Sequence, residues 1–179
     1  MKATGFNEFI ARVDAAEYGL CVRLNRGASL ALPRRIFQLA SRLGDGIVWY
    51  VLLGGLPLLY GSVALRPVLM MAVTGAIGVV LYTFLKRVCV RERPFITHAA
   101  IDRAAAPLDR YSFPSGHTLH AVCFTWQASA HFPELVWMLL PLAALIAASR
   151  VVLGLHYPSD VLAGAALGAG LAAAGLALG

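Results

Sequence analysis

Three short polar stretches interrupt an otherwise strongly apolar chain and hold most of its reactive side chains. They read KRVCVRERP at residues 86–94, PSGH at 114–117 and SRVVLGLHYPSD at 149–160. The first and third stretches supply lysine and arginine, and the second and third each supply a histidine. Fixed cations stabilise the charge of a transferring phosphoryl group, and an imidazole can act as nucleophile or proton donor. The sequence therefore indicates an anion site that carries out chemistry at phosphorus.

A nucleophile can be assigned within the third stretch. His156 and Asp160 are four residues apart, so on one helix turn they would share a face, and the carboxylate would accept a hydrogen bond from the imidazole. Such a bond fixes the tautomer and leaves the second ring nitrogen free to attack phosphorus. His117 in the second stretch is then free to protonate a leaving alkoxide. These three residues are the predicted catalytic group.

The predicted phosphate ligands come from all three stretches. Lys86 and Arg93 are seven residues apart, or two helical turns, and they point the same way if the helix continues that far. Ser115 and Gly116 open the next apolar run, where free backbone N–H groups and the helix dipole favour an anion. Arg150 adds a third cation, although a single Lys or Arg at the end of a span can also serve only to reach the membrane surface.

Three further residues are candidates for contact with a lipid headgroup. His98 and Arg110 lie in the polar loop between the first two stretches, and His120 follows His117 by three residues. The alternative for the two loop residues is a loop held by its own hydrogen bonds, and for His120 it is an internal hydrogen bond within a span. The three cysteines show neither paired nor metal-like spacing and are assigned no function.

The elements that hold these residues are predicted to be transmembrane helices. The chain has 179 residues, of which 59% are hydrophobic and 13% charged, and its mean hydropathy is +0.73, outside the balance of a soluble domain. Three nearly uncharged runs reach about 20 residues, enough to cross ~30 Å of hydrocarbon, and two shorter runs reach that length if the polar stretches belong to the same helices. We therefore predict an all-α integral membrane bundle of five transmembrane helices, with six as the alternative. The five runs are 46–65, 67–85, 119–132, 135–148 and 161–179.

A single domain is expected to fill residues 1–179, because the five runs leave no room for a separate soluble domain. Residues 1–45 form an N-terminal segment in which apolar residues recur at roughly helical spacing. This pattern is typical of an amphipathic helix on the bilayer surface, with an ordinary packed terminal helix as an equal alternative. Residues 46–179 form the predicted transmembrane catalytic bundle.

The order of the runs predicts where the polar stretches meet. If successive helices alternate direction, residues 86–114 and 150–160 fall on one side of the membrane, where four helix ends converge. The formal charge of +6 gathers at these edges and is not interleaved with exposed aromatic residues, so anionic headgroups or phosphates are the expected partners and nucleic acid is not. Small residues in the last run permit close helix packing, either within the bundle or across a homodimer, and include Gly164, Gly168, Gly170 and Gly175.

The combined spacing KxxxxxxRP, PSGH and SRxxxxxHxxxD resembles the three-part signature of the type 2 phosphatidic acid phosphatase superfamily. The resemblance implies a bacterial membrane lipid phosphatase that needs neither a metal nor a cofactor. It also implies that His156 becomes a phosphohistidine, that Asp160 orients it and that His117 protonates the leaving group. The matching positions are Lys86, Arg93, Pro94, Pro114–His117, Ser149, Arg150, His156 and Asp160.

The resemblance allows several substrates and bears on the membrane face. Bacterial members of this compact size act on undecaprenyl diphosphate, phosphatidylglycerophosphate, phosphatidic acid or lipid A phosphates, and many work on the periplasmic face of the inner membrane. The basic residues of this chain would instead turn the site to the cytoplasm under the positive-inside rule. We expect the periplasmic face. The alternatives in function are a lipid-to-lipid phosphotransferase with the same nucleophile, and a non-catalytic protein that binds or transports a lipid phosphate.

Overall fold

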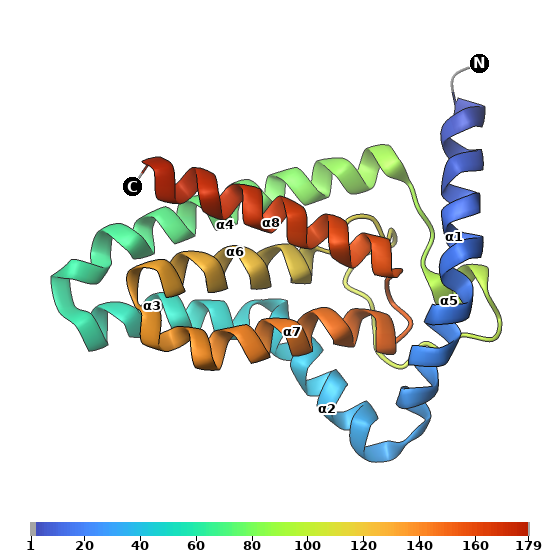
Figure 1. Cartoon of the computed structure of the whole chain (residues 1–179), viewed down its shortest axis with the longest axis horizontal. Helices are drawn as coiled ribbons and strands as arrows, with labels where there is room; N and C mark the ends of the chain where they lie inside the picture. The colour runs from blue at the N-terminus through green and yellow to red at the C-terminus, as the bar shows by residue number, and fades with distance from the viewer. Residues whose placement is uncertain (1–2, 179) are drawn as a thin grey trace.

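The computed structural model of the protein describes the backbone of residues 3–178 and the side chains of residues 8 and 10–178. Within residues 3–178 every regular element is a helix, which confirms the all-α prediction. Figure 1 shows long helices running side by side, with one further helix crossing their end. In chain order the elements are α1 (Ala3–Asn25), η1 (Arg26–Ser29), α2 (Ala31–Arg42), η2 (Leu43–Ile47), α3 (Val48–Tyr60), η3 (Gly61–Ala64), α4 (Leu65–Cys89), α5 (Pro94–Thr97), α6 (Gly116–His131), η4 (Pro133–Leu135), α7 (Val136–Val152) and α8 (Pro158–Leu178).

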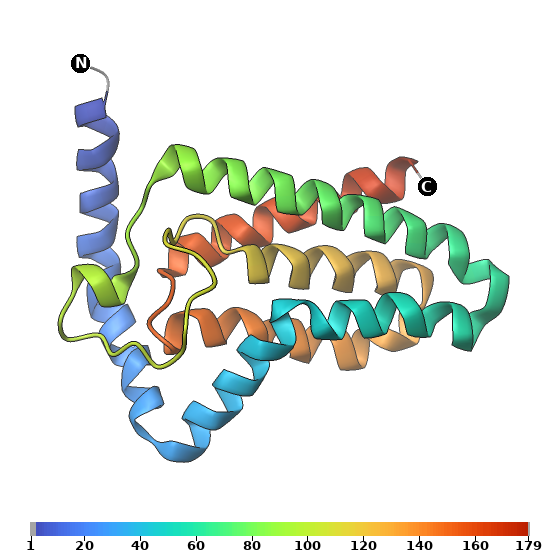
Figure 2. The same ribbon diagram turned by 180° about the vertical axis from the view of Figure 1, so that it is seen from behind.

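Helix α6 is the centre of the bundle and packs against α4, α7 and α8 (Figures 1 and 2). Ten of its 16 residues are buried, because uncharged side chains surround its whole circumference. Its Phe124 ring stacks on the indole of Trp49 from α3, with ring centroids 5.3 Å apart, inside the main apolar cluster. Because three helices enclose α6, it is the element against which the site can be held rigidly.

Close contact between α6 and α8 depends on glycines. A Cβ atom at Gly164 would lie 2.4 Å from the carbonyl oxygen of Ser115, and one at Gly168 would lie 2.3 Å from that of Leu119. Neither distance is tolerable, so only glycine permits this approach. The small residues at these two positions therefore serve packing within the bundle, one of the two expected uses, and the homodimer stays a prediction.

The N-terminal segment lies at the end of the bundle where the polar stretches meet. Helix α1 crosses that end of the long helices (Figure 2), and Asn25 at its last turn hydrogen-bonds the carbonyls of Asp102 and Val152 at 3.0 Å each. Helix α2 leaves Leu32, Ile36 and Leu39 exposed on one face. An apolar face on a helix at the bundle end suits the bilayer surface. Residues 1–2 of the predicted N-terminal segment lie outside the part of the chain that the structure describes.

The apolar segments of the structure do not coincide one to one with the five spans that the sequence predicted. Three segments are long and apolar enough to cross a bilayer, at Ala31–Thr97, Pro133–Val152 and Pro158–Leu178. The predicted span 46–65 is divided, because α3 ends after 13 residues at Tyr60, and the following Gly61 has a φ of 66° in the left-handed region. The multi-helix membrane architecture is thus retained, and the count of five stays a prediction.

Helix α4, which carries Lys86, ends before it reaches Arg93. Lys86 and Arg93 were expected to point the same way if the helix continued to Pro94, but α4 ends at Cys89, and Val90 adopts a left-handed conformation with φ 45°. Arg93 is in extended conformation just before α5. Lys86 and Arg93 therefore do not share a helix face, and their meeting is achieved by a turn of the chain.

Candidate active site

The three polar stretches meet at one pocket of about 840 Å³. Its lining includes residues at the C-terminal ends of α4 and α7, at the N-terminal end of α6 and just before α8. These helix ends lie at the same end of the bundle, as alternating helices predicted (Figure 2). The predicted catalytic and phosphate-binding residues that line it are His117, His156, Lys86, Arg93, Gly116 and Arg150. Both imidazoles thus face the same space.

His156 lies in the turn between α7 and α8, not on a helix. Its backbone N–H donates to the carbonyl of Arg150 at 3.0 Å, and its Nε2 lies 3.3 Å from Nη1 of Arg93. Burial, followed by the charges of Arg150, Arg93 and Lys86, holds the pKa of His156 well below its ordinary value. The ring is therefore neutral at pH 7, which is the state that a nitrogen nucleophile requires.

The expected hydrogen bond between His156 and Asp160 is absent, which corrects the sequence prediction. Nδ1 of His156 lies 3.6 Å from Oδ2 of Asp160 and has no hydrogen-bond partner among the described residues. The carboxylate is engaged elsewhere, because Oδ2 accepts the backbone N–H of Tyr157 at 2.8 Å and Oδ1 accepts Nη1 of Arg91 at 2.6 Å. Asp160 still lies near Nδ1, and a small shift would bring it within hydrogen-bond distance.

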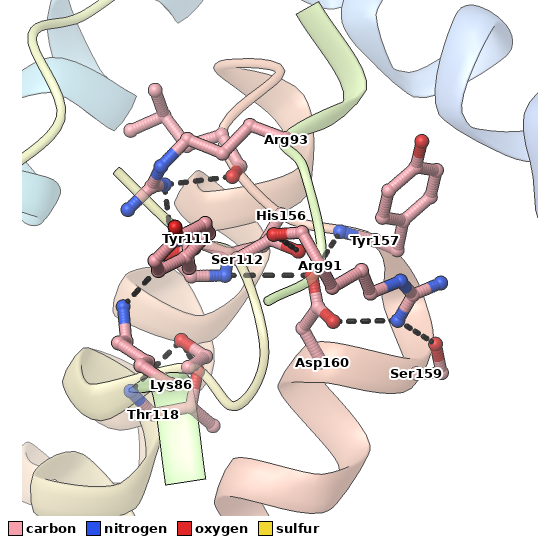
Figure 3. A network of polar contacts seen from close by, with 12 residues as sticks. Lys86, Arg91, Arg93, Tyr111, Ser112, Thr118, His156, Tyr157, Ser159 and Asp160 are labelled. Atoms are coloured by element: carbon pink, nitrogen blue, oxygen red, sulfur yellow. Dashed lines mark hydrogen bonds and ion pairs between the residues drawn. The ribbon is translucent and has the colours of Figure 1, made fainter. Parts of the chain in front are cut away.

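Arg91 is a buried cation that sequence reasoning missed. Figure 3 shows it reaching Asp160 and Ser159, and its Nη2 also donates to Asp14 of α1 at 2.6 Å and to Glu17 of α1 at 3.1 Å. Burial lowers the pKa of Arg91, but the carboxylates of Asp160 and Asp14 outweigh it and raise that pKa above its ordinary value. The surface helix α1 is therefore tied to the carboxylate beside the nucleophile.

Lys86 and Arg93 both hold the carboxylate of Asp109. Nζ of Lys86 donates to both oxygens of Asp109 at 2.7 Å and to the carbonyl of Tyr111 at 3.0 Å, a contact drawn in Figure 3. Nη2 of Arg93 donates to Oδ1 of Asp109 at 2.7 Å. Burial raises the pKa of Asp109, but Lys86 and Arg93 outweigh it and hold that pKa below its ordinary value. The carboxylate of Asp109 thus already binds both cations, and a substrate phosphate must displace this carboxylate to bind both of them.

Arg150 and the start of α6 complete the anion site. Arg150 is 2% exposed, donates from Nη1 to the hydroxyl of Ser41, and its Nε has no hydrogen-bond partner among the described residues. Gly116 lines the pocket at the first position of α6. Ser115 does not, because its buried hydroxyl caps the helix by accepting the N–H of Thr118 at 3.4 Å. The predicted serine ligand is thus a helix cap.

His117 has a carboxylate partner that the sequence did not suggest. Its Nε2 lies 2.6 Å from Oδ1 of Asp45, which belongs to η2 between α2 and α3. Both residues line the pocket. We had placed residue 45 at the end of a separate surface segment, so nothing in the spacing of the motifs linked it to the site.

The three candidates for headgroup contact divide between the pocket and the protein interior. Arg110 and His120 line the pocket, and Nε2 of His120 also lies 3.1 Å from the carbonyl oxygen of Gly75. His98 is not among the lining residues. Its ring packs against Tyr18 with centroids 4.6 Å apart and meets Tyr157 edge-on at 6.3 Å, so aromatic neighbours hold it away from the pocket.

The far side of the pocket is apolar. Its lining includes Trp49 and Leu53 of α3, Ala76 and Val79 of α4, and Phe124 of α6. A cationic end that continues into an apolar groove between two helices matches a ligand with a phosphate joined to a hydrocarbon chain.

Comparison with known proteins identifies the family. The family model described as "PAP2 superfamily" matches residues 64–178. This chain belongs to the PAP2 superfamily. The resemblance inferred from the three polar stretches is confirmed, and all of those stretches fall within the matched region.

Two curated relatives of this chain are named as phosphatases. The decaprenylphosphoryl-5-phosphoribose phosphatase of Mycobacterium tuberculosis is 32% identical over 152 residues, covering 82% of this chain and 78% of that protein. The lipid A 1-phosphatase of Rhizobium johnstonii is 37% identical over 93 residues, which covers 50% of this chain and 38% of that protein. These names place the chain among membrane lipid phosphatases, as the sequence predicted.

A solved structure supports the fold. The crystal structure of the first transmembrane PAP2 type phosphatidylglycerolphosphate phosphatase from Bacillus subtilis aligns with a TM-score of 0.71. The alignment covers 98% of this chain and 94% of that one at 21% identity. The helical architecture of this protein is therefore that of a multi-pass PAP2 membrane protein.

Proposed function

We propose that this protein releases inorganic phosphate from a lipid phosphate without a metal ion, through a phosphohistidine at His156. The observation that carries the proposal is a single pocket lined by two imidazoles, by three cations and by apolar side chains of α3, α4 and α6. Three fixed cations can supply the positive charge that stabilises a transferring phosphoryl group.

The two chemical steps follow from the roles of the two imidazoles. In the first, Nε2 of His156 bonds to phosphorus, the bond from phosphorus to the lipid oxygen breaks, and His117 gives a proton to that oxygen. In the second, His117 takes a proton from a water molecule that attacks phosphorus, and the bond from phosphorus to His156 breaks. Lys86, Arg93 and Arg150 hold the phosphate oxygens throughout, assisted by the backbone N–H of Gly116.

We assign the protein to the bacterial inner membrane, with five spanning helices and the pocket on the periplasmic face. Helices α3, α4, α6, α7 and α8 are the proposed spans, and α1 and α2 lie on the surface. The periplasmic face follows from the resemblance to bacterial family members. The positive-inside rule favours the cytoplasmic face instead, and anionic lipid substrates at the pocket weaken that argument without cancelling it.

A phosphate-release assay on purified protein in detergent tests the proposal. Polyprenyl diphosphate, phosphatidylglycerophosphate, phosphatidic acid and lipid A are each offered without an acceptor lipid. We expect phosphate release from at least one of them, unaffected by EDTA, inhibited by vanadate and abolished by His156→Ala. Absence of release from all four, or loss of release in EDTA, contradicts a metal-independent phosphatase. Release without an acceptor lipid excludes an obligatory lipid-to-lipid transferase.

A further inference from the structure

The segment that carries Asp45 is shaped to present this residue to His117. Gly44 has no room for a Cβ atom, which would lie 2.9 Å from Ile146 and 3.1 Å from the ring of His117. Gly46 has a φ of 131°, a conformation that other residues rarely adopt. The two glycines flank Asp45 and let the chain turn tightly against α6 and α7. The carboxylate of Asp45 then lies 2.6 Å from Nε2 of His117.

The charges around His117 give this contact a chemical role. Lys86 and Arg150 line the same pocket and disfavour a positively charged imidazole. A proton donor must nevertheless carry the proton that it delivers. Among the described residues, Asp45 is the carboxylate in direct contact with the ring. It therefore favours the protonated ring and fixes its orientation.

The need for this proton depends on the leaving group. A lipid phosphomonoester expels an alkoxide, a very strong base that must be protonated as its bond breaks. A lipid diphosphate attacked at its terminal phosphorus expels a lipid monophosphate, which is a much weaker base, leaves without a proton and carries negative charge of its own. Next to His117 that charge would face the carboxylate of Asp45 and be repelled.

We propose that Asp45 is a positioning residue for His117 and that it biases the site toward lipid phosphomonoesters over lipid diphosphates. The inference rests on the proposed function, in which His117 protonates the leaving oxygen. The proton passes from the ring nitrogen that Asp45 does not hold, and Asp45 remains a carboxylate while the ring becomes neutral.

Substrates that differ only in the leaving group test the role of Asp45. The wild type, Asp45→Asn and Asp102→Asn are compared on a long-chain alkyl phosphate, the matching alkyl diphosphate and p-nitrophenyl phosphate, whose leaving group needs no proton. Asp102→Asn removes the same charge from an exposed position in the loop beside the site. The asparagine at position 45 keeps the size of the side chain, which is one-third exposed, so folding is not at risk.

We expect Asp45→Asn to lower kcat/KM for the alkyl phosphate by about 10- to 100-fold, part of the usual contribution of general acid catalysis. Turnover of p-nitrophenyl phosphate should stay near the wild-type rate, and turnover of the diphosphate should be unchanged or increased. Asp102→Asn should match the wild type on all three substrates.

Equal losses on all three substrates indicate a purely structural role and overturn the inference, as does an unchanged rate on the alkyl phosphate. The variant Asp45→Glu, which restores a carboxylate, should recover part of the alkyl phosphate activity, and a variant no better than Asp45→Asn also argues against the proposal. If the wild type releases no phosphate from any substrate, the proposed function itself fails. The ratio of kcat/KM between the substrates tests the role of Asp45 alone.

Discussion

The nucleophilic character of His156 comes from its surroundings. The ring is 1% exposed and lies among Arg93, Arg150 and Lys86, whose charges oppose its protonation. A neutral ring nitrogen close to an arginine that binds phosphate can attack phosphorus without first losing a proton. The same surroundings make the ring costly to bury when the medium is acidic.

This cost predicts a dependence of stability on pH. The pKa of His156 lies well below its ordinary value of 6.5 in the folded protein, so below pH 6.5 this residue binds more protons in the unfolded chain than in the folded one. The contribution of His156 to the free energy of unfolding therefore falls as the pH drops below 6.5. We expect His156→Asn to reduce this fall, measured as the thermal unfolding midpoint in detergent on both sides of that pH.

His131 provides the matched control for this experiment. It is an exposed histidine at the other end of α6, and His131→Asn should leave the pH dependence of the midpoint as in the wild type. An equal pH dependence in the wild type and in His156→Asn would contradict a buried, neutral imidazole.

Several residues of the site could be predicted because motif spacing reports on chemistry directly. His117, His156 and the three cations were placed together on their types and order alone. Asp45 and Arg91 were not, because their partners are distant in sequence and are reached only through tertiary packing. Asp45 pairs with a residue 72 positions away, and Arg91 joins residues of α1 and α8. No local pattern marks such pairs.

At the scale of the helices, the α6–α8 contact determines where the start of α6 sits. The carbonyl of Asp160 in α8 accepts the backbone N–H of Ser115, at 3.0 Å, just before the first turn of α6. The glycines of α8 let the two helices approach closely enough for this bond. Packing at the glycines therefore supports the anion-binding end of α6.

Alanine substitutions in α8 should distinguish a glycine that contacts α6 from a glycine that does not. Gly168→Ala places a Cβ atom 2.3 Å from the carbonyl oxygen of Leu119, and we expect it to destabilise the protein by about 1–3 kcal/mol, the usual cost of overpacking. Gly170 has nothing within 4 Å of a Cβ atom, so Gly170→Ala should be neutral or stabilising by up to about 1 kcal/mol.

Thermal unfolding of the two variants in the same detergent makes the comparison direct. Both changes add one methyl group to the same helix, so helix propensity and hydrophobicity are matched. Equal midpoints for Gly168→Ala and Gly170→Ala would show that α8 does not press against α6 as the structure has it.

Helix positions could be predicted better than helix ends. The apolar runs located α4, α6, α7 and α8, because a long uncharged run in a membrane protein has few alternatives to a helix. The ends at Cys89 and Tyr60 were missed, since a left-handed residue at Val90 or Gly61 is set by the path of the following chain. The apolar run continues through the break at Gly61, so hydropathy alone could not find it.

For the whole molecule, the arrangement of helix ends explains why a lipid phosphate is the expected substrate. The polar residues gather at one end of an apolar bundle, and the pocket extends from them between α3 and α4. A substrate with its phosphate at the membrane surface and its hydrocarbon chain in the bilayer would meet both surfaces at once. Helix α1, tied to Asp160 through Arg91, crosses the same end (Figure 1).

Trapping of the phosphorylated protein tests the central claim most directly. A lipid substrate labelled at phosphorus is mixed with the protein, the reaction is stopped in alkali to preserve phosphohistidine, and the labelled peptide is identified by mass spectrometry. We predict that the label appears on His156 within the first turnover and that His156→Ala carries none. A label on another residue, or steady turnover by His156→Ala, would contradict the account.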